Sequence, residues 1–313
     1  MEAPGLLSWV EGTDPFRVAK SFQRFEDLSE DILFPIYSIV VARNHAMRHR
    51  SLNPAAPPWD IPPHLYQSFT MDNRVKVAKH YVDESAPEAR DNYLFGFYRA
   101  SRQEIDNLVQ KATNQQEGYY GDTDNQLYSA IQAIGGLQGK SVVIMGSLEP
   151  WYEAICIAFG AESCTTIEYN QLQFDHPRIS TYTTAEFEAL QDKPVFDVAF
   201  SISSFEHDGL GRYGDPVDPE GDLRAMHQMQ SIVKPKGVLF LAVPVGEDLV
   251  KWNAHRKYGK IRLPVLMANW TLTHQFGLTE SRLVDPSPDS HFQPVFVLQN
   301  QLPSKPLDLE SYL

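Results

Sequence analysis

Short apolar runs alternate with longer amphipathic segments in the second half of the chain. Five of the runs predict buried strands, at 141–146, 164–169, 178–182, 195–203 and 238–244. Segments at about 150–159 and 222–233 predict helices, the second stopped by the KPKG sequence, and 263–276 predicts a further helix. Residues 278–284 and 294–300 predict a closing antiparallel pair. Near-continuous apolar strands alternating with helices indicate an α/β fold, a doubly wound, Rossmann-like and mostly parallel sheet.

The first half of the chain has a different pattern. Residues 32–42 and the basic octet 43–50 predict a helix with a basic, solvated end, followed by a connector with five prolines at 51–63. Apolar residues at helical spacing predict helices within 73–82 and 86–110. We therefore expect a helical or irregular N-terminal cap region at 1–117, a Rossmann-like domain at 118–302 and a C-terminal tail at 303–313.

Polar residues and a glycine follow three of the predicted strands. The first strand ends at Gly146 and Ser147, the second at Glu168, and the fourth at the segment 203–208. In doubly wound sheets, ligands bind beyond the carboxyl ends of the strands. Gly146 permits close backbone approach, and an acidic residue at the spacing of Glu168 can bind a ribose diol. Each residue alone is equally compatible with a plain turn or a solvated carboxylate.

The first turn reads GSLEPW and contains a single glycine. A dinucleotide brings a pyrophosphate whose approach needs several glycines, so the turn disfavours NAD and FAD. A ligand with adenine and ribose but no phosphate fits a one-glycine turn better. S-adenosyl-L-methionine is such a ligand, and we expect it as the cofactor.

Residues from about 118 to 300 resemble the class I S-adenosylmethionine-dependent methyltransferase superfamily, and more narrowly a branch catalogued as a domain of unknown function. The strings that carry the closer resemblance are GSLEPWYE (146–153), TIEYN (166–170), SSFEHDGLGRYGDP (203–216), VKPKG (233–237) and NAHRKYG (253–259). The resemblance implies that Gly146 and Ser147 line the methionine portion of the cofactor, Glu168 holds the ribose, and Phe205 lies near its other side. Further cofactor contacts are expected from Glu149, Trp151, Tyr169, Asn170 and Ser204.

The segment 206–216 is rich in glycine, acidic residues and groups that can move a proton. A hydroxyl acceptor benefits from a base of near-neutral pKa, so His207 is the candidate base, with Asp208 orienting it or receiving a substrate hydroxyl. His255 is a second candidate base. A histidine here could instead cap the strand end or pack against the following helix.

Other polar residues near these strand ends are candidates for contacts with the methyl acceptor. They are Arg212, Tyr213, Asp215, Asn253 and Arg256. An arginine could clamp a carboxylate or phosphate, although a surface salt bridge is an equally good interpretation. Oxygen and imidazole groups of Glu206, His207, Asp208, Asp215 and Asp218 could bind a metal, but they lack a recognised ligand spacing, so we expect none.

Composition narrows the class of partner. The 313 residues include 40 acidic and 27 basic ones, giving a net charge of -13, with 42% hydrophobic residues. This excludes wholesale disorder and disfavours nucleic acid and anionic membranes as partners. The acidic excess is greatest after residue 140, which suits a cationic cofactor and a neutral, small or carbohydrate-like acceptor.

Two cysteines, Cys156 and Cys164, stand in apolar surroundings and predict buried thiols in a reducing compartment. The N-terminus lacks the pattern of a secretory signal, and no apolar run approaches the ~20 residues of a membrane span. A soluble, cytoplasmic protein is therefore expected.

The preferred hypothesis is a methyltransferase acting on an oxygen of the acceptor. The alternative is a methyltransferase-like binding or scaffold protein without turnover. A nicotinamide-dependent oxidoreductase is disfavoured by the missing glycines.

Overall fold

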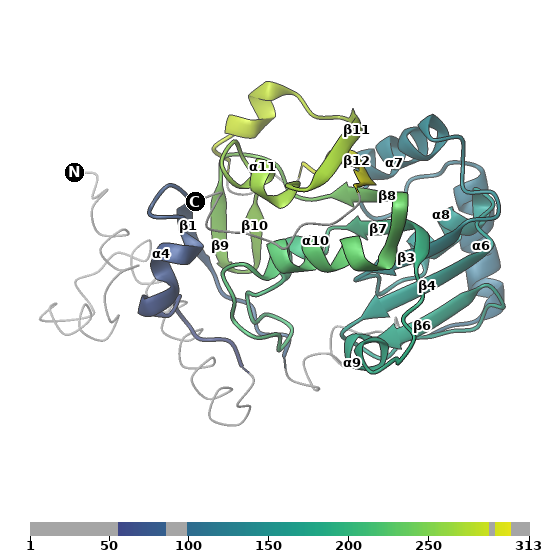
Figure 1. Ribbon diagram of the computed structural model, residues 1–313, viewed down its shortest axis with the longest axis horizontal. Helices are drawn as coiled ribbons and strands as arrows, with labels where there is room; N and C mark the ends of the chain where they lie inside the picture. The colour runs from purple at the N-terminus through teal and green to yellow at the C-terminus, as the bar shows by residue number, and fades with distance from the viewer. Residues whose placement is uncertain (1–55, 86–98, 288–291, 302–313) are drawn as a thin grey trace, which may run out of the picture.

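The computed structural model describes residues 56–85, 99–287 and 292–301. Its centre is a seven-stranded sheet in the order β11-β12-β8-β7-β3-β4-β6 (Figure 1). The strands are β3 (Ser141–Met145), β4 (Ser163–Glu168), β6 (Ile179–Thr183), β7 (Phe196–Ile202), β8 (Val233–Ala242), β11 (Trp270–Phe276) and β12 (Val295–Asn300). The five strands β3, β4, β6, β7 and β8 run parallel, and β12 is antiparallel to both of its neighbours. The strand order reverses between β3 and β7, so the predicted doubly wound, mostly parallel fold is confirmed.

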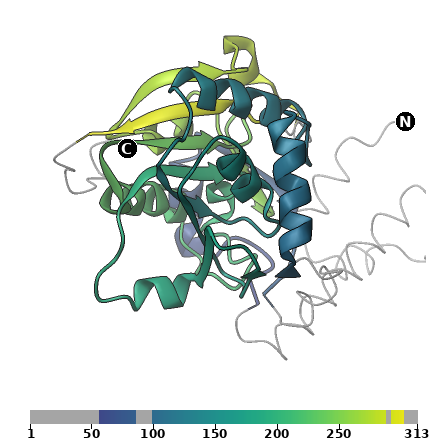
Figure 2. The ribbon, with the colours of Figure 1, turned by 90° about the vertical axis from the view of Figure 1, so that its right-hand side faces the viewer.

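Helices cover both faces of this sheet (Figure 2). One face packs against α6 (Arg102–Thr113), α7 (Asp122–Ala133) and α8 (Trp151–Ala158), and the other against α9 (Thr184–Glu188), α10 (Gly221–Ile232) and α11 (Arg262–Leu266). Successive side chains of a strand alternate between the two cores: Val142 and Ile144 belong to the first, Val143 to the second. Burial on both sides explains why these strands are nearly continuous apolar runs.

A second, three-stranded sheet lies beside the first (Figure 1). Strand β1 (Lys76–His80) pairs in parallel with β9 (Leu249–Asn253), which pairs antiparallel with β10 (His255–Lys257). A small core containing Phe69, Leu210 and Trp252 packs against it. The remaining elements are η2 (Pro63–Leu65), α4 (Tyr66–Phe69), β2 (Arg99–Ala100) paired with β5 (Gln173–Phe174), η3 (Phe205–His207) and η4 (Glu280–Val284).

Three predicted elements are wrong. Within 73–82 the chain forms the strand β1 rather than a helix, because it pairs with β9 and because Met71, Asp72 and Asn73 all have positive φ, which no helix allows. The predicted helix at 263–276 ends at Leu266, and Asn269, with φ of 67°, turns the chain into β11. Residues 280–284 form a short 3₁₀ turn, so β12 pairs with β11 and β8 instead.

Other predicted elements are confirmed, or lie partly or wholly outside the residues that the structure describes. The KPKG sequence follows the last residue of α10 but lies inside β8. The helix predicted within 86–110 is α6 from Arg102 onward, whereas 99–100 form β2; the helix predicted at 32–50 lies outside the described residues. Cys156 and Cys164 are buried free thiols, as expected. Of the helices that the structure describes, none has the length and apolar character that a membrane crossing requires.

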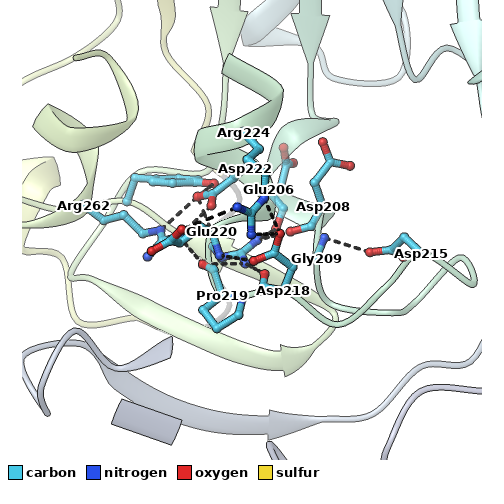
Figure 3. Close-up of polar contacts among 12 residues, drawn as sticks. Glu206, Asp208, Gly209, Asp215, Asp218, Pro219, Glu220, Asp222, Arg224 and Arg262 are labelled. Atoms are coloured by element: carbon cyan, nitrogen blue, oxygen red, sulfur yellow. Dashed lines mark hydrogen bonds and ion pairs between the residues drawn. The ribbon is translucent and has the colours of Figure 1, made fainter. Parts of the chain in front are cut away.

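A buried ionic network joins α10 to the second sheet (Figure 3). Asp222, at the start of α10, accepts hydrogen bonds from Arg262 Nε at 2.9 Å and Nη2 at 2.6 Å. The hydroxyl of Tyr258 donates to the same carboxylate at 2.9 Å, and Arg256 Nε lies 3.8 Å away. Asp222 and Arg256 have no exposed side-chain surface, and the two guanidinium groups hold the pKa of Asp222 below its usual range although burial opposes this.

We expect Asp222→Asn to lower the free energy of unfolding by about 3–5 kcal/mol, because two buried guanidinium groups lose their anion. Urea denaturation measures the loss. Glu220→Gln is the matched control, since its 3.7 Å ion pair with Arg224 is half-exposed and its removal changes stability by less than about 1 kcal/mol. Equal effects of the two substitutions contradict the structural role of the network.

Candidate functional site

A cavity of about 400 Å³ opens at the carboxyl ends of β3, β4 and β7. Eight of the residues predicted from the sequence line it: Gly146, Glu168, Tyr169, Ser204, Phe205, His207, Asp208 and Tyr213. The cavity continues between α9 and α10, where Phe187, Met229 and Ile232 form an apolar wall. The polar residues and the glycine at the strand ends therefore predict one part of the site. The apolar wall formed by α9 and α10 has no motif in the sequence that predicts it.

The turn after β3 is fixed by the space around Gly146. This glycine has a φ of 71°, and a Cβ added to it would clash with Ser204 Oγ. The predicted close approach is therefore to Ser204, at the end of β7. Ser147 is buried and does not line the cavity, because its hydroxyl donates to the carbonyl of Glu149 at 2.7 Å.

A buried carboxyl group lies under the same turn. Glu153, in the first turn of α8, contacts the hydroxyl groups of Thr166 and Ser147. Burial raises its pKa to about 7, against the effect of these hydrogen bonds. Glu153 has no exposed surface and does not line the cavity, so its carboxyl group supports the turn from beneath.

The end of β4 presents an acidic group and an aromatic ring. Glu168 is 8% exposed and its Oε1 accepts hydrogen bonds from the side chain and the backbone of Asn170, at 2.6 and 3.2 Å. Asn170 therefore orients Glu168 and does not itself line the cavity. The Tyr169 hydroxyl donates to Asp208 Oδ1 at 3.3 Å, which bridges the ends of β4 and β7. Burial raises the pKa of Asp208, and the charge of Asp215 adds to the effect.

His207 is held in one orientation. Its Nδ1 lies 2.7 Å from the carbonyl oxygen of Ala254, which can only accept, so Nδ1 carries the proton and Nε2 keeps its lone pair. Nε2 lies 3.7 Å from Glu206 Oε1, and the ring of Tyr213 packs edge-on at 5.7 Å. Burial lowers the pKa of His207 well below its usual value, and Arg212 lowers it further, so the imidazole is neutral.

Arg212 and Asp215 lie outside the lining of the cavity. The guanidinium of Arg212 binds Glu84 through two hydrogen bonds, at 3.0 and 3.2 Å, and donates to the carbonyl of Ala254. Arg212 therefore makes a largely buried salt bridge with a residue of the N-terminal region rather than the expected surface salt bridge, and the clamp on a substrate anion stays a prediction. The Asp215 carboxylate accepts three backbone N–H groups of its own loop, so it shapes the loop.

Asn253, His255 and Arg256 are buried in the second sheet and also lie outside the lining. The amide of Asn253 joins the backbone of Val82 to that of Leu210. Arg256 donates to the backbone carbonyls of Glu206, Asp208, Asp218 and Pro219, so its predicted contact with a substrate is replaced by a contact with the loop. The His255 and His207 rings lie 6.3 Å apart, which leaves His255 behind the candidate base.

Two predicted cofactor contacts point elsewhere. Trp151 packs into the core between the sheet and α7, where its indole lies against Gly118 and Asp124. Glu149 is exposed. Within the parts of the chain that the structure describes, no three His, Cys, Asp or Glu side chains are grouped so as to hold a metal ion. Asp218, one of the residues considered for that role, binds Arg224.

The sheet order and the cavity at its strand ends define the class: this is a class I methyltransferase-like fold. Residues 139–291, just under half of the chain, match the family model described as "Caenorhabditis protein of unknown function, DUF268". The predicted resemblance to a methyltransferase-like branch of unknown function is therefore confirmed. No curated protein matches the chain.

Among solved structures, the chain is similar to several methyltransferases. N-methyltransferase NodS from Bradyrhizobium japonicum WM9 is 12% identical, with a TM-score of 0.38, over 57% of this chain and 94% of that one. An S-adenosylmethionine-dependent methyltransferase from Mesorhizobium loti is 12% identical, with a TM-score of 0.39, over 56% and 98%. TehB from Haemophilus influenzae is 10% identical, with a TM-score of 0.37, over 56% and 62%. The fold of this chain is defined by its own strand order.

We expect Gly146→Ala to destabilise the protein by about 1–3 kcal/mol, because the new Cβ meets both an unfavourable φ and the Ser204 side chain. Urea denaturation measures the effect. Gly135→Ala is the control, since this glycine has a φ of 84° but no atom within 4 Å of the added Cβ. It isolates the backbone strain, and an equally large effect there refutes the close packing of the turn on Ser204.

Proposed function

We propose that this protein is an S-adenosylmethionine-dependent methyltransferase that transfers a methyl group to an oxygen of a small or carbohydrate-like acceptor. The observation that carries the proposal is the cavity itself. It lies where the strand order reverses, with Gly146 and Glu168 at the ends of adjacent strands and a neutral histidine on its wall. Ligands of doubly wound sheets bind at this position.

The chemical character of the lining supports this cofactor. The volume falls within the range of about 300–1,000 Å³ of small-molecule sites. Apolar side chains between α9 and α10 suit an adenine ring, and Glu168 suits a ribose diol. The acidic side chain of Glu168 favours a cation. Lys193 also lines the cavity, but it is paired with Glu188, and the single glycine of the first turn leaves no phosphate cradle.

When bound, S-adenosylmethionine supplies a methyl group activated by a positively charged sulfur. The protein's own contribution is to position the acceptor and receive its proton. His207 presents a lone pair at the cavity wall, while Tyr169, Asp208 and Tyr213 offer aromatic faces and oxygen atoms near it. Such groups suit the hydroxyl groups of a neutral polyol better than a phosphorylated substrate.

The second candidate function is a methyltransferase-like binding or scaffold protein without turnover. The reduction of the first turn to one glycine, packed against Ser204, favours it. Consumption of S-adenosylmethionine in the presence of a panel of hydroxylated acceptors distinguishes the two functions.

We also infer a cytoplasmic location and partners that exclude nucleic acid and membranes. The two cysteines are free and buried, and the net charge is -13. A reducing compartment suits free thiols, and an acidic surface repels polyanions.

We expect S-adenosylmethionine and its demethylated product S-adenosylhomocysteine to bind, and Glu168→Ala to weaken both by about 1–3 kcal/mol through the loss of a buried hydrogen bond. Titration calorimetry measures both affinities. Glu162→Ala, an exposed acidic residue just before the same strand, is the control and leaves them unchanged. Failure of the wild-type protein to bind either ligand refutes the proposed function; unchanged affinity in the Glu168 variant refutes only the role of this carboxylate.

A further inference from the structure

A buried carboxyl group, that of Glu206, lies beside the candidate base His207. Glu206 is 1% exposed and does not itself line the cavity. Its Oε1 accepts a hydrogen bond from Ser203 at 2.8 Å and lies 3.7 Å from His207 Nε2. Its Oε2 is buried with no hydrogen-bond partner among the described residues. Glu206 contacts Ser203 and His207, and both of these residues line the cavity. A single side chain, of Ser203 or of His207, therefore separates Glu206 from the cavity.

Ser203 is the centre of a polar cluster on this side of the cavity. It has a φ of 54°, a conformation that non-glycine residues rarely adopt and that often marks functional sites. Its hydroxyl accepts a hydrogen bond from Gln293 Nε2 at 3.1 Å and also forms a hydrogen bond with the hydroxyl of Tyr120. In the described part of the chain, Gln293 Oε1 and the Tyr152 hydroxyl are likewise buried without hydrogen-bond partners. So many incompletely bonded polar groups indicate a place built to interact with a polar group rather than a packing core.

The charges around Glu206 and His207 decide which of these two residues takes up a proton. Burial raises the pKa of Glu206 to about 7, although Ser203, Arg212 and Arg256 oppose the rise. The pKa of His207 is lowered by burial and by Arg212, His255 and Arg256. Four tyrosine hydroxyl groups also face Glu206: Tyr120, Tyr152, Tyr213 and Tyr258. Near neutral pH the carboxyl group is therefore the member that changes charge.

We propose that Glu206 and His207 form one proton-accepting pair, in which His207 contacts the methyl acceptor and Glu206 is the residue on which the proton comes to rest. The inference rests on the proposed function and deepens it. As the acceptor oxygen bonds to the methyl carbon, the carbon–sulfur bond breaks and its electron pair stays on sulfur. The hydroxyl proton passes to His207 Nε2 and from there to Glu206 Oε1.

The orientation of His207 makes this order necessary. Its Nδ1–H is held by the carbonyl of Ala254, so that nitrogen cannot take part. The remaining nitrogen, Nε2, lies 3.7 Å from Glu206 Oε1, and His207 itself lines the cavity, so a proton gained on Nε2 has a stronger base beside it. Glu206 is thus a positioning residue that acts through His207.

The first test uses the free protein and needs no acceptor. In ¹⁵N and ¹³C NMR titrations, we expect His207 to remain the neutral Nδ1–H form from pH 5 to 8, with ring shifts that follow a single step near pH 7 caused by Glu206. The step disappears in Glu206→Gln and persists in Glu153→Gln, the matched control, a second buried carboxyl group whose pKa burial also raises to about 7. A His207 that becomes protonated within this range overturns the proposal, and so does the absence of a step in the wild-type protein, whether or not the variants fold.

The second test measures calorimetrically how pH changes the preference for the cationic S-adenosylmethionine over the neutral S-adenosylhomocysteine. Glu206 is mostly protonated at pH 6 and ionised at pH 8, so the cation is favoured at the higher pH. If the sulfonium lowers the pKa of Glu206 from about 7 by about one unit, linkage makes the preference rise by about fivefold between pH 6 and pH 8. The rise is lost in Glu206→Gln and retained in Glu153→Gln.

Asp208 provides the discriminating comparison, because it lines the cavity and burial raises its pKa as well. Loss of the pH-dependent preference in Asp208→Asn but not in Glu206→Gln assigns the titration to Asp208 and overturns the inference. A wild-type protein that binds neither ligand refutes the proposed function instead, while the NMR titration still decides whether the pair exists.

Discussion

The arrangement of the site depends on the buried ion pairs that the carboxylate of Asp222 forms with Arg262 and Arg256. This carboxylate neutralises Arg262 directly and lies beside Arg256, whose guanidinium also binds four backbone carbonyl groups between residues 206 and 219. The loop therefore has a charged anchor in addition to the apolar packing of Leu210. Because an arginine does not lose its proton in a protein, this anchor keeps its positive charge over the whole physiological pH range. A fixed loop in turn places His207 and Asp208 at the cavity.

Contacts from the second sheet and the N-terminal region complete this anchor. The carbonyl of Ala254, between β9 and β10, accepts from both His207 and Arg212, and Arg212 is in turn neutralised by Glu84. Asn253 joins the same region to Val82. Residues preceding the Rossmann-like sheet thus take part in orienting the candidate base. Burial, and after it the nearby guanidinium of Arg212, lowers the pKa of His207 and keeps the imidazole neutral.

The sequence predicts the sheet and two corners of the site because both follow from local patterns. Apolar runs predict the buried strands, and a strand end places Gly146 and Glu168 where a ligand binds in this fold. The loop between β7 and α10 is not predictable in this way. Arg212 within the loop and Arg256 outside it both bind backbone carbonyl groups of residues about 40 or more positions away in the sequence. The residue type alone does not distinguish Arg256 as a loop anchor from a substrate clamp. Strand β1 is likewise not predictable from local pattern, because its structure is decided by pairing with β9, 173 positions away in register.

Two buried glutamates show why position rather than pKa decides a role. Burial raises the pKa of both Glu153 and Glu206 to about 7. Glu153 lies in the first turn of a helix with hydroxyl groups of Ser147 and Thr166 around it, and its contacts remain within the β3–α8 turn and β4. Glu206 has an oxygen without a partner and lies between two residues of the cavity wall. A carboxyl group that is half-ionised at neutral pH can serve catalysis only where a proton can reach it from the ligand, and of these two residues only Glu206 is so placed.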